Sequence, residues 1–560
     1  MKNINSTKGT QIMQALLFIF TAILPTIAKQ NVPVAQRCTA KITDIPGQEL
    51  FYPKTNNSAQ TFRKSLYWDW TKIDPQSMTP EAIAQTFKER RKKIKNNDTE
   101  FLIGGAISAH QAEGNCTNNT YYLWEKAKKD DPACPSIQEE SGIACDHWNR
   151  YKEDLDLVKN ANLNTLRISV EWSKVQPRKP TQDDDGFDYA VLQHYDDLCE
   201  QAAQRGIKVV VTLHHYTDPI WFALEGGFEE QKNIHYFSTF CSRVFEALND
   251  KVHLWFTFNS PSGYSSLIYL TNVAPPSSFK KLDKKLVKNY KETNDKNFLI
   301  EALKKYKPKA KDMVTATSVL KNVALAHVQA YKAIKQCIGG QDSKIGILKN
   351  IHQVDPWNPA NLLDKLTAFV PNELNDESLF NFFTTGTFRV RIPIPWFGKW
   401  VNTSYHHPDA TKSLDFIGLN YYSHRFMHNV EKKMYPGEKM TGNKNYTVYP
   451  EGLYRAIDTI YKRVAQPLDI PIYITENGIA TDDDELRNEF LQKYTLVIAK
   501  AIEDGYPING YIHWSLLDNF EWGNYNKHYG IYKVDFDTME RTLKPGSQHL
   551  VDLAKETFAA

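Results

Sequence analysis

Residues 209–215 read Val-Val-Val-Thr-Leu-His-His, a short apolar run that ends in two polar side chains. Such a run is typical of a buried strand, and the chain contains eight runs of this kind separated by segments with helical periodicity. The strand candidates are Phe101–Ala106, Thr165–Val170, Val209–His215, Leu254–Asn259, Ile345–Asn350, Asp415–Tyr422, Ile472–Asn477 and Gly510–Leu517. Alternating strands and helices predict a parallel sheet covered by helices, and eight units favour an α/β fold closed into a (β/α)₈ TIM barrel.

Polar side chains close several of these predicted strands. They are His214, His215, Asn259, Asn420, Glu476 and Asn477. The carboxyl ends of the strands in a (β/α)₈ barrel form the face that carries the active site. The pattern therefore predicts one polar pocket at that face.

The chain has 560 residues, which indicates either two domains or one large barrel with insertions. We expect a single catalytic domain over residues 101–560 with long loops. A polar extension over residues 29–100 precedes it, with a helical stretch from Pro80 to Lys95. A Lys-rich insertion from Asn272 to Val314 shapes a substrate entrance or forms a solvated helical excursion, and the second interpretation is favoured.

The first 28 residues have the pattern of an export signal. Lys2 and Lys8 precede an apolar run from Ala15 to Leu24, and Ala28 supplies a small residue for cleavage. The run is too short to span a bilayer comfortably. We therefore expect a secreted or periplasmic protein without stable membrane insertion after cleavage; an uncleaved N-terminal anchor is the alternative.

The amino-acid composition bears on which classes of binding partner, disulfide and metal site to expect. The formal net charge is +3, with 41% hydrophobic and 24% charged residues, which gives no argument for nucleic acid or an anionic membrane as a partner. Seven cysteines are present, and three of them, Cys116, Cys134 and Cys145, crowd one region where an exported protein forms disulfides. No Cys/His spacing resembles a metal site, and no cofactor is implied.

Several segments resemble motifs of glycoside hydrolase family 1, the β-glucosidase family. Ile474-Thr475-Glu476-Asn477-Gly478 is similar to the nucleophile motif of that family, and the other matching segments stand in the family's order between about Phe101 and Lys544. They are Ile103–Ala106 with Gln111 and Glu113-Gly114, Asp146–Trp148, Leu166–Ser169 with Glu171-Trp172, Thr212–Tyr216 with Pro219, Asp415–Tyr422 and Trp514–Trp522. Tyr216 stands where the family usually has Trp.

The resemblance implies a pocket for one sugar ring and a retaining mechanism. Glu476 would be the nucleophile, and Arg167 and Tyr422 would contact it and keep it charged and oriented. Ring hydroxyls would bind a set of polar side chains at the strand ends, above a stacking floor formed by Trp514. That set comprises Gln111, His215, Asn259, Asn420, Glu521 and Trp522. The implied ligand is a small β-glycoside or oligosaccharide whose glycone is glucose, galactose or fucose.

One position departs from the pattern. The family reads Asn-Glu-Pro at the end of the fourth strand, whereas this chain reads Asn259-Ser260-Pro261. Retention needs a second carboxyl about 5–5.5 Å from the first, to protonate the leaving oxygen and then to activate water. A serine hydroxyl does neither at neutral pH without a partner, and losing such a group costs about 10²–10⁴ in rate.

Three interpretations of Ser260 follow. The first is hydrolysis of O- or S-glycosides whose leaving groups need no proton, as in the plant myrosinases, which carry Gln at this position. The second is transfer of the glycosyl group to an acceptor other than water. The third is a catalytically silent sugar-binding protein, as in the klotho-type proteins of the same family. Two further possibilities stay open. A loop such as the Lys-rich insertion could supply the acid, or Ser260 could be an engineered substitution. Retention of Glu476 favours the enzyme.

Overall fold

The computed structural model describes residues 59–559 apart from 95–99, 272, 307–311 and 395–398. The expected export signal and the first part of the extension lie outside the described residues. Within the described residues, no helix combines the length and the apolar character that crossing a membrane requires.

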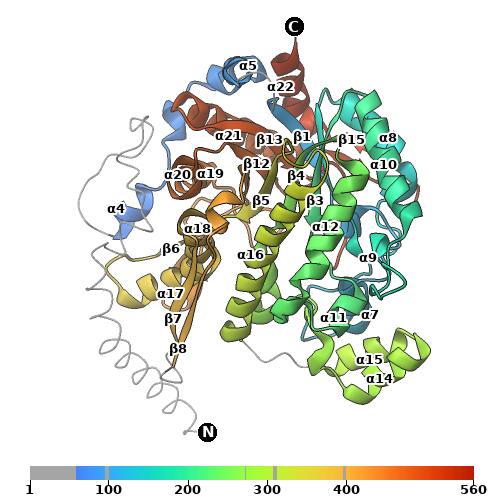
Figure 1. Ribbon diagram of the computed structural model, residues 1–560. Helices are drawn as coiled ribbons and strands as arrows, with labels where there is room; N and C mark the ends of the chain where they lie inside the picture. Colours follow the sequence, from blue (N-terminus) through green and yellow to red (C-terminus); the bar gives the residue numbers. More distant parts are fainter. Residues whose placement is uncertain (1–58, 95–99, 272, 307–311, 395–398, 560) are drawn as a thin grey trace.

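Eight parallel strands close into a barrel inside a ring of helices (Figure 1), which confirms the predicted fold. Its order is β1-β13-β12-β9-β5-β4-β3-β2. The strands are β1 Leu102–Ala106, β2 Thr165–Ser169, β3 Lys208–His214, β4 Val252–Asn259, β5 Ile345–Asn350, β9 Phe416–Asn420, β12 Ile472–Asn477 and β13 Ile508–Trp514. Two of the eight have the predicted bounds and the others differ by one to three residues at an end.

Apolar side chains fill the barrel interior, and a separate layer lies between strands and helices. Leu102, Val210, Leu254, Phe256 and Tyr473 are among the buried interior residues. Gly104 is required where β1 approaches β2, because a Cβ there would lie 2.2 Å from the carbonyl oxygen of Thr165. The filled interior makes the barrel a rigid platform for the side chains at its carboxyl end.

The helices that surround the barrel follow the predicted alternation. They are α8 His147–Asn160, α10 Tyr189–Gln204, α12 Ile234–Leu248, α16 Met313–Gln336, α19 Pro450–Ile460, α21 Asp484–Glu503 and α22 Gln548–Phe558. Asp188 and Asp483 cap the first turns of α10 and α21 by accepting backbone N–H bonds. Shorter helices lie in the loops: α6 Ala109–Ala112, α7 Thr120–Lys128, α9 Trp172–Val175, α11 Ile220–Leu224, α13 Pro261–Ser266 and α20 Gln466–Leu468.

The described part of the extension packs against the barrel. It contains α4 Ala59–Lys64 and α5 Pro80–Lys93, the second close to the predicted helical stretch. Arg90 donates to the carbonyl of Ile508 at 3.0 Å, and Trp70 Nε1 donates to buried Glu451 at 2.6 Å. These contacts make residues 59–94 part of the barrel's outer layer.

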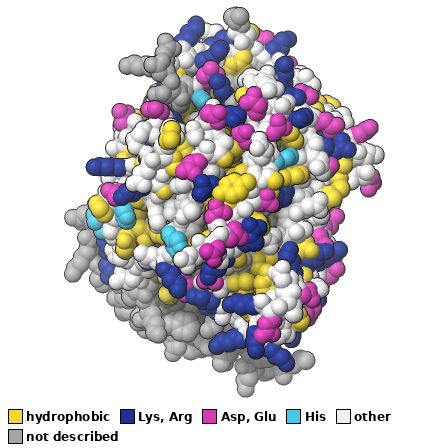
Figure 2. All heavy atoms as spheres, turned by 45° about the vertical axis from the view of Figure 1, so that its right-hand side comes forward, with side chains coloured by type: hydrophobic (Ala, Val, Ile, Leu, Met, Phe, Trp, Pro, Cys, Tyr) yellow, Lys and Arg dark blue, Asp and Glu magenta, His cyan; other side chains and the backbone are white. Residues whose placement is uncertain are grey.

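Insertions enlarge the loops of the barrel. The Lys-rich insertion forms α14 Lys284–Thr293 and α15 Asn297–Lys305, and Leu299 and Leu303 of α15 pack against Trp124 of α7. Figure 2 shows Lys and Arg side chains gathered on the lower part of this side of the molecule, among acidic ones. The insertion is thus the solvated helical excursion that the sequence favoured.

A second group of insertions follows β5 and β9. It contains a three-stranded sheet that combines β6 Gln353–Pro356, which follows β5, with β10 His424–His428 and β11 Glu431–Lys433, which follow β9. It also contains α17 Leu362–Asn372, α18 Ser378–Thr385 and the hairpin of β7 Thr387–Ile394 with β8 Lys399–His406. A last two-stranded sheet, β14 Tyr532–Val534 with β15 Arg541–Leu543, precedes α22.

Among the described residues, the crowded cysteines do not form the disulfide for which the sequence made them candidates. Cys116, Cys134 and Cys145 are buried and free, as are Cys199 and Cys241. Burial raises the pKa of the Cys116 and Cys145 thiols well above the usual range, so both sulfurs are protonated fillers of the core. Spacing along the chain misled here because the side chains do not meet in the fold.

Candidate active site

The predicted nucleophile Glu476 is the last residue but one of β12 and lies at the mouth of the barrel. Arg167 Nη1 donates to its Oε1 at 2.6 Å, and the Tyr422 hydroxyl donates to its Oε2 at 2.8 Å. Glu476 is 5% exposed and Arg167 is fully buried. Both carboxylate oxygens are therefore fixed in place by hydrogen bonds, one of them from a guanidinium, in an orientation that suits nucleophilic attack.

A chain of hydrogen bonds beside Glu476 joins residues of three strands to His215, which directly follows β3. Asn420 Nδ2 donates to Asn259 Oδ1 at 2.9 Å, and Thr475 donates to Asn420 Oδ1 at 2.7 Å. Asn259 lies 3.2 Å from a ring nitrogen of His215. Burial, and then the charge of Arg167, hold the pKa of His215 well below its usual range, so its imidazole is neutral and offers one donor and one acceptor.

The predicted sugar-contacting residues meet around the same mouth. Gln111 is held between Ser108, which donates to its Oε1 at 2.7 Å, and Asn519, which accepts from its Nε2 at 3.1 Å. Trp514 Nε1 donates to Glu521 Oε1 at 2.8 Å. The rings of His215 and Trp514 are stacked with centroids 5.7 Å apart, and Trp522 lies beyond His215 at 6.1 Å. The structure thus brings together all eleven residues that the sequence singled out for catalysis or binding.

Ser260 stands at the end of β4 in a left-handed backbone conformation, with φ of +44°. Its backbone N–H donates to the carbonyl of Leu348 at 3.0 Å, but its buried Oγ has no hydrogen-bond partner among the described residues. A Cβ on Gly263 would lie 2.6 Å from Ser260 Oγ and 2.9 Å from the Tyr216 hydroxyl. Two hydroxyls therefore border the place where the family resemblance puts a carboxyl.

Carboxyl groups from the loops have other partners. Asp376 forms an ion pair with Lys349 at 2.5 Å, and Lys349 Nζ lies 3.3 Å from the hydroxyl of Ser262. Among the described residues of the Lys-rich insertion, Asp283 and Asp312 cap helices and Glu301 pairs with Lys304. None of these contacts supplies Ser260 with an acid, so the structure does not support the acid from a loop.

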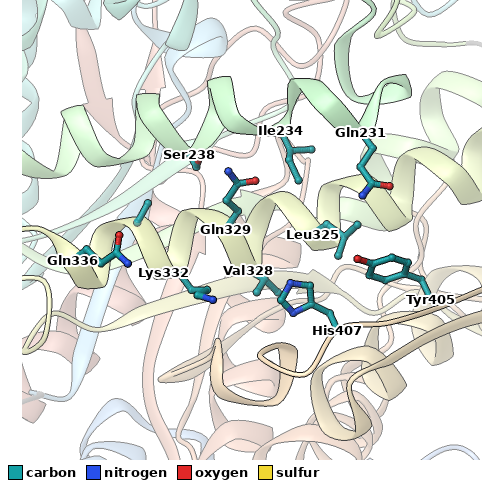
Figure 3. Close-up of a pocket in the computed structure, with 11 residues that line it drawn as sticks. Gln231, Ile234, Ser238, Leu325, Val328, Gln329, Lys332, Gln336, Tyr405 and His407 are labelled. Carbon is teal, nitrogen blue, oxygen red and sulfur yellow. The ribbon is translucent and has the colours of Figure 1, made fainter.

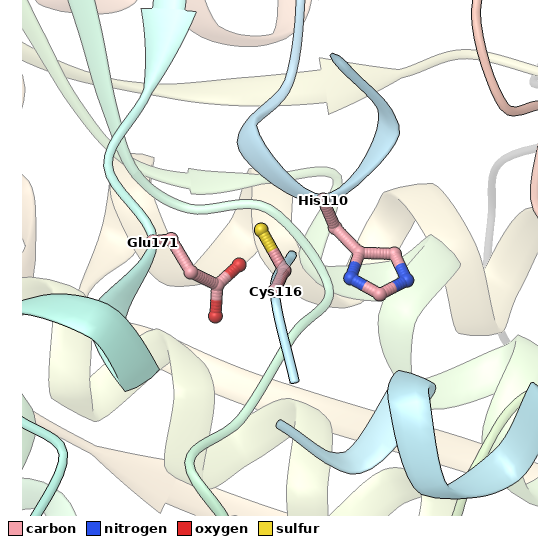
Figure 4. A group of neighbouring side chains, drawn as sticks. All are labelled: His110, Cys116 and Glu171. Atoms are coloured by element: carbon pink, nitrogen blue, oxygen red, sulfur yellow. The ribbon is translucent and has the colours of Figure 1, made fainter. Parts of the chain in front are cut away.

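Three potential metal ligands lie close together behind the pocket (Figure 4). The donor atoms of His110, Cys116 and Glu171 are all within 4.8 Å of one another. The His110 ring nitrogens already contact Glu125 at 2.6 Å and Asn119 at 3.1 Å. Glu171 accepts hydrogen bonds from Ser173 and Thr217. Because the protein satisfies these groups, we interpret them as a network that joins the loops after the first, second and third strands.

A hollow of about 420 Å³ on the outer wall of the barrel is separate from this site (Figure 3). It lies between α12 and α16, and residues such as Ile234, Val328, Gln329 and Tyr405 line it. Its lysine, Lys332, pairs with Asp409 at 2.7 Å. None of the predicted site residues lines the hollow, and we assign it no role.

Comparison with models of known protein families shows which family this chain matches. The model of glycosyl hydrolase family 1 matches residues 94–558, most of the chain. The chain belongs to glycosyl hydrolase family 1. Beta-glucosidase A of Thermotoga maritima is 26% identical over 473 residues, which cover 80% of this chain and 96% of that protein.

Two further comparisons bear on function. The chloroplastic galactolipid galactosyltransferase SFR2 of Arabidopsis thaliana is 27% identical over 478 residues, covering 84% of this chain and 66% of the plant protein. The solved structure of a beta-glycosidase from Pyrococcus horikoshii is 29% identical, with a TM-score of 0.65 and coverage of 82% and 94% of the two chains. The relatives are thus enzymes that act on glycosides, one of them a transferase by name.

Some residues of the site were not predicted from the sequence. Tyr446 stacks on Tyr422 with centroids 5.5 Å apart, and it comes from a long loop without periodicity. Ser108 and Asn519 hold Gln111, and a signal for both was present because they flank or lie within quoted family motifs. Asn350 ends β5 in register with Asn420, and its buried Oδ1 has no partner among the described residues.

A first prediction concerns the pH dependence of sugar binding. Burial raises the pKa of Glu521 to about 7. Below that pH the group is a neutral acid; above it the carboxylate accepts hydrogen bonds from ring hydroxyls, and bonds to a charged acceptor are the stronger ones. The affinity for a neutral glucose-configured inhibitor is therefore expected to rise, by about tenfold in all, as the pH rises through 7.

Calorimetric titration at several pH values checks this expectation. Glu521→Gln is the matched control, because it keeps the shape of the side chain and cannot titrate. Its affinity is expected to be weaker and nearly independent of pH between 6 and 8. An unchanged slope in the variant would assign the titration to another group.

Proposed function

We propose that this protein is a retaining β-glycosidase that uses Glu476 as its nucleophile and Ser260 in place of the acid/base carboxyl. It acts on glycosides whose leaving groups depart without a proton. The observation that carries the proposal is the pair of contacts that hold both oxygens of Glu476, from Arg167 at 2.6 Å and Tyr422 at 2.8 Å. A site that only binds sugar has no need of a carboxylate held in this way.

The first chemical step needs only groups that are present. Glu476 attacks the anomeric carbon, the bond to the leaving oxygen or sulfur breaks, and the aglycone departs with the electron pair as an anion. The neutral Gln111, Asn259 and His215 and the Trp514 ring would hold the glycone during this step. A covalent glycosyl ester of Glu476 results.

The second step lacks a base. Water must lose a proton as it attacks the ester, and Ser260 offers only a hydroxyl. Transfer to an acceptor other than water is therefore a second candidate function, supported by the 27% identity to a galactosyltransferase. Silent sugar binding is the remaining alternative. Separately, the first 28 residues are the basis for proposing that the protein is exported.

A small anion is expected to replace the missing base. Azide should accelerate turnover of an activated aryl β-glucoside by about tenfold or more, because the group it replaces is worth about 10²–10⁴. Azide attacks the anomeric carbon of the ester, which releases Glu476 and yields the β-glycosyl azide. Release of the phenol is followed by absorbance, and the product is identified by mass spectrometry and its anomeric configuration by NMR.

The Ser260→Gln variant provides the control, because its larger side chain occupies the space that azide would use. Formate should also accelerate the wild-type protein, as a general base and without forming a new glycoside. Turnover that neither anion alters, with no glycosyl azide formed, would contradict the open position beside Ser260.

A further inference from the structure

A face of basic side chains lies on the small sheet of β6, β10 and β11. Lys432 of β11 pairs with Met427 of β10, two residues after Arg425. Side chains paired in register, and alternate residues of one strand, lie on the same face of a sheet. Arg425 and Lys432 therefore share a face, and Lys433 lies on the other. We call Arg425, Lys432 and His352, the residue that precedes β6, the basic face.

The basic face adjoins the mouth of the barrel. The hydroxyl of Tyr422 bonds to Glu476, the ring of Tyr422 stacks on that of Tyr446, and the ring of Tyr446 lies 6.1 Å from that of His352. The path from the nucleophile to His352 thus passes through two aromatic rings. Because two aromatic side chains separate the basic face from the nucleophile, we assign the face to the aglycone rather than to the reacting sugar ring.

Two nitrogen atoms of the basic face lack a hydrogen-bond partner in the part of the chain that the structure describes. Nε2 of His352 and Nε of Arg425 are buried and form no hydrogen bond with a described residue. Burial, and then the charges of Arg425 and Lys432, hold the pKa of His352 well below its usual range, so its ring is neutral. Lys432 Nζ donates to the carbonyl of Asn445 at 2.7 Å.

The nearby acids are used elsewhere. Glu438 contacts His424 and Tyr67, and Glu431 pairs with Lys433 at 3.0 Å. Neither forms an ion pair with Arg425 among the described residues. Arg425 and Lys432 therefore leave a net positive charge beside the pocket, and buried donors of this kind are normally satisfied by a ligand or by water.

We propose that the basic face binds an anionic group, a carboxylate or a phosphate, carried by the aglycone. This inference rests on the proposed function and names the substrate class of the same site. Arg425 supplies a planar pair of donors, and His352 and Lys432 supply further ones. The cations would also stabilise the negative charge that the aglycone carries away when it leaves without a proton, which is the step that Ser260 cannot assist.

Binding is measured on the Glu476→Gln variant, so that no ligand is consumed. The two probes are a carboxyphenyl β-D-glucoside and its methyl ester, which share a sugar and a ring but differ in charge. Calorimetry is expected to give about ten- to hundredfold tighter binding of the carboxylate, as for hydrogen bonds between charged groups. The preference should decrease as the salt concentration rises. A phosphorylated phenyl glucoside distinguishes phosphate from carboxylate.

Arg425→Gln in the same background is expected to reduce this preference to about twofold or less. Lys433→Gln is the matched control, because it removes an equal charge from the opposite face of the same sheet and should leave the preference intact. The inference would be overturned if the carboxylate and its ester bound with equal affinity. It would also be overturned if Arg425→Gln and Lys433→Gln reduced the preference for the carboxylate equally. Because binding is read without turnover, failure here is distinct from failure of the glycosidase proposal.

Discussion

Replacing Ser260 with glutamate is expected to raise turnover of ordinary aryl β-glucosides by about 10²–10⁴-fold. The reason is that the other residues that the family resemblance implies for a retaining site lie around Glu476 in the structure. A carboxyl at position 260 would protonate the leaving oxygen in the first step and deprotonate water in the second. The rates of both steps should increase. Because protonation matters most for leaving groups that are basic, the increase should be largest for substrates with such leaving groups. Initial rates over a series of phenols of different acidity measure it.

The shape of the site decides how the variant must be made. The Tyr216 hydroxyl and Gly263 border the Ser260 side chain, and Tyr216 stands where the family usually has Trp. A longer side chain at position 260 has to share this space with the hydroxyphenyl ring of Tyr216. The double variant Ser260→Glu with Tyr216→Trp therefore tests the same expectation with the neighbour that the family uses.

Ser260→Gln serves as the control for size, since it cannot transfer a proton. Its turnover is expected to stay at or below that of the wild-type protein. A gain in Ser260→Glu should bring a new ionisation into the pH–rate profile, whereas a gain from packing would not. If both glutamate variants fold, as judged by thermal unfolding, and neither gains activity, Ser260 does not occupy the acid/base position.

The barrel was predictable because its strands are buried along almost their whole length. Runs such as Ile345–Asn350 and Ile472–Asn477 are apolar on both faces and end in polar residues, and their observed bounds are the predicted ones. The strand ends converge because the sheet is parallel and closed, so Glu476, Asn259 and Asn420 had to share one mouth. Local sequence pattern and barrel topology are therefore enough to predict the strands and the position of these three side chains.

Pairings between loops were not predictable in the same way. The contact between Tyr422 and Tyr446 and the basic face around Arg425 depend on how loops after different strands fold back over the barrel. Their residues show no period, and their partners are distant in the sequence. The cysteines illustrate the opposite error, because Cys116, Cys134 and Cys145 are close in sequence but buried as separate thiols.

An activated 2-fluoro β-glucoside is expected to label Glu476 covalently. Fluorine at the second carbon slows both chemical steps, and a dinitrophenolate leaves without a proton, so the ester forms and then persists. Ser260 does not impede formation of this ester and further slows its hydrolysis. Intact-protein mass spectrometry should show the addition of one fluoroglucosyl group, and peptide mapping should place it on Glu476.

Two variants separate the nucleophile from its supports. Glu476→Gln is expected to abolish labelling, and to lower turnover of activated substrates on the order of 10⁴-fold or more, as for other covalent nucleophiles. Tyr422→Phe removes only the 2.8 Å hydrogen bond to Oε2 and keeps the ring that stacks on Tyr446. It should be labelled at the same residue about ten- to hundredfold more slowly, the worth of one bond to a charged group.

Label on another residue would assign the nucleophile elsewhere, and Glu521, the second carboxyl of the pocket, is the residue to compare. Protein that stays unlabelled after long incubation, while a glucose-configured inhibitor still binds, would identify a silent sugar-binding protein. The outcome depends on Arg167 and Tyr422, because a carboxylate held at both oxygens is oriented for attack without help from position 260. Labelling therefore separates enzyme from binding protein independently of whether water or another acceptor completes the reaction.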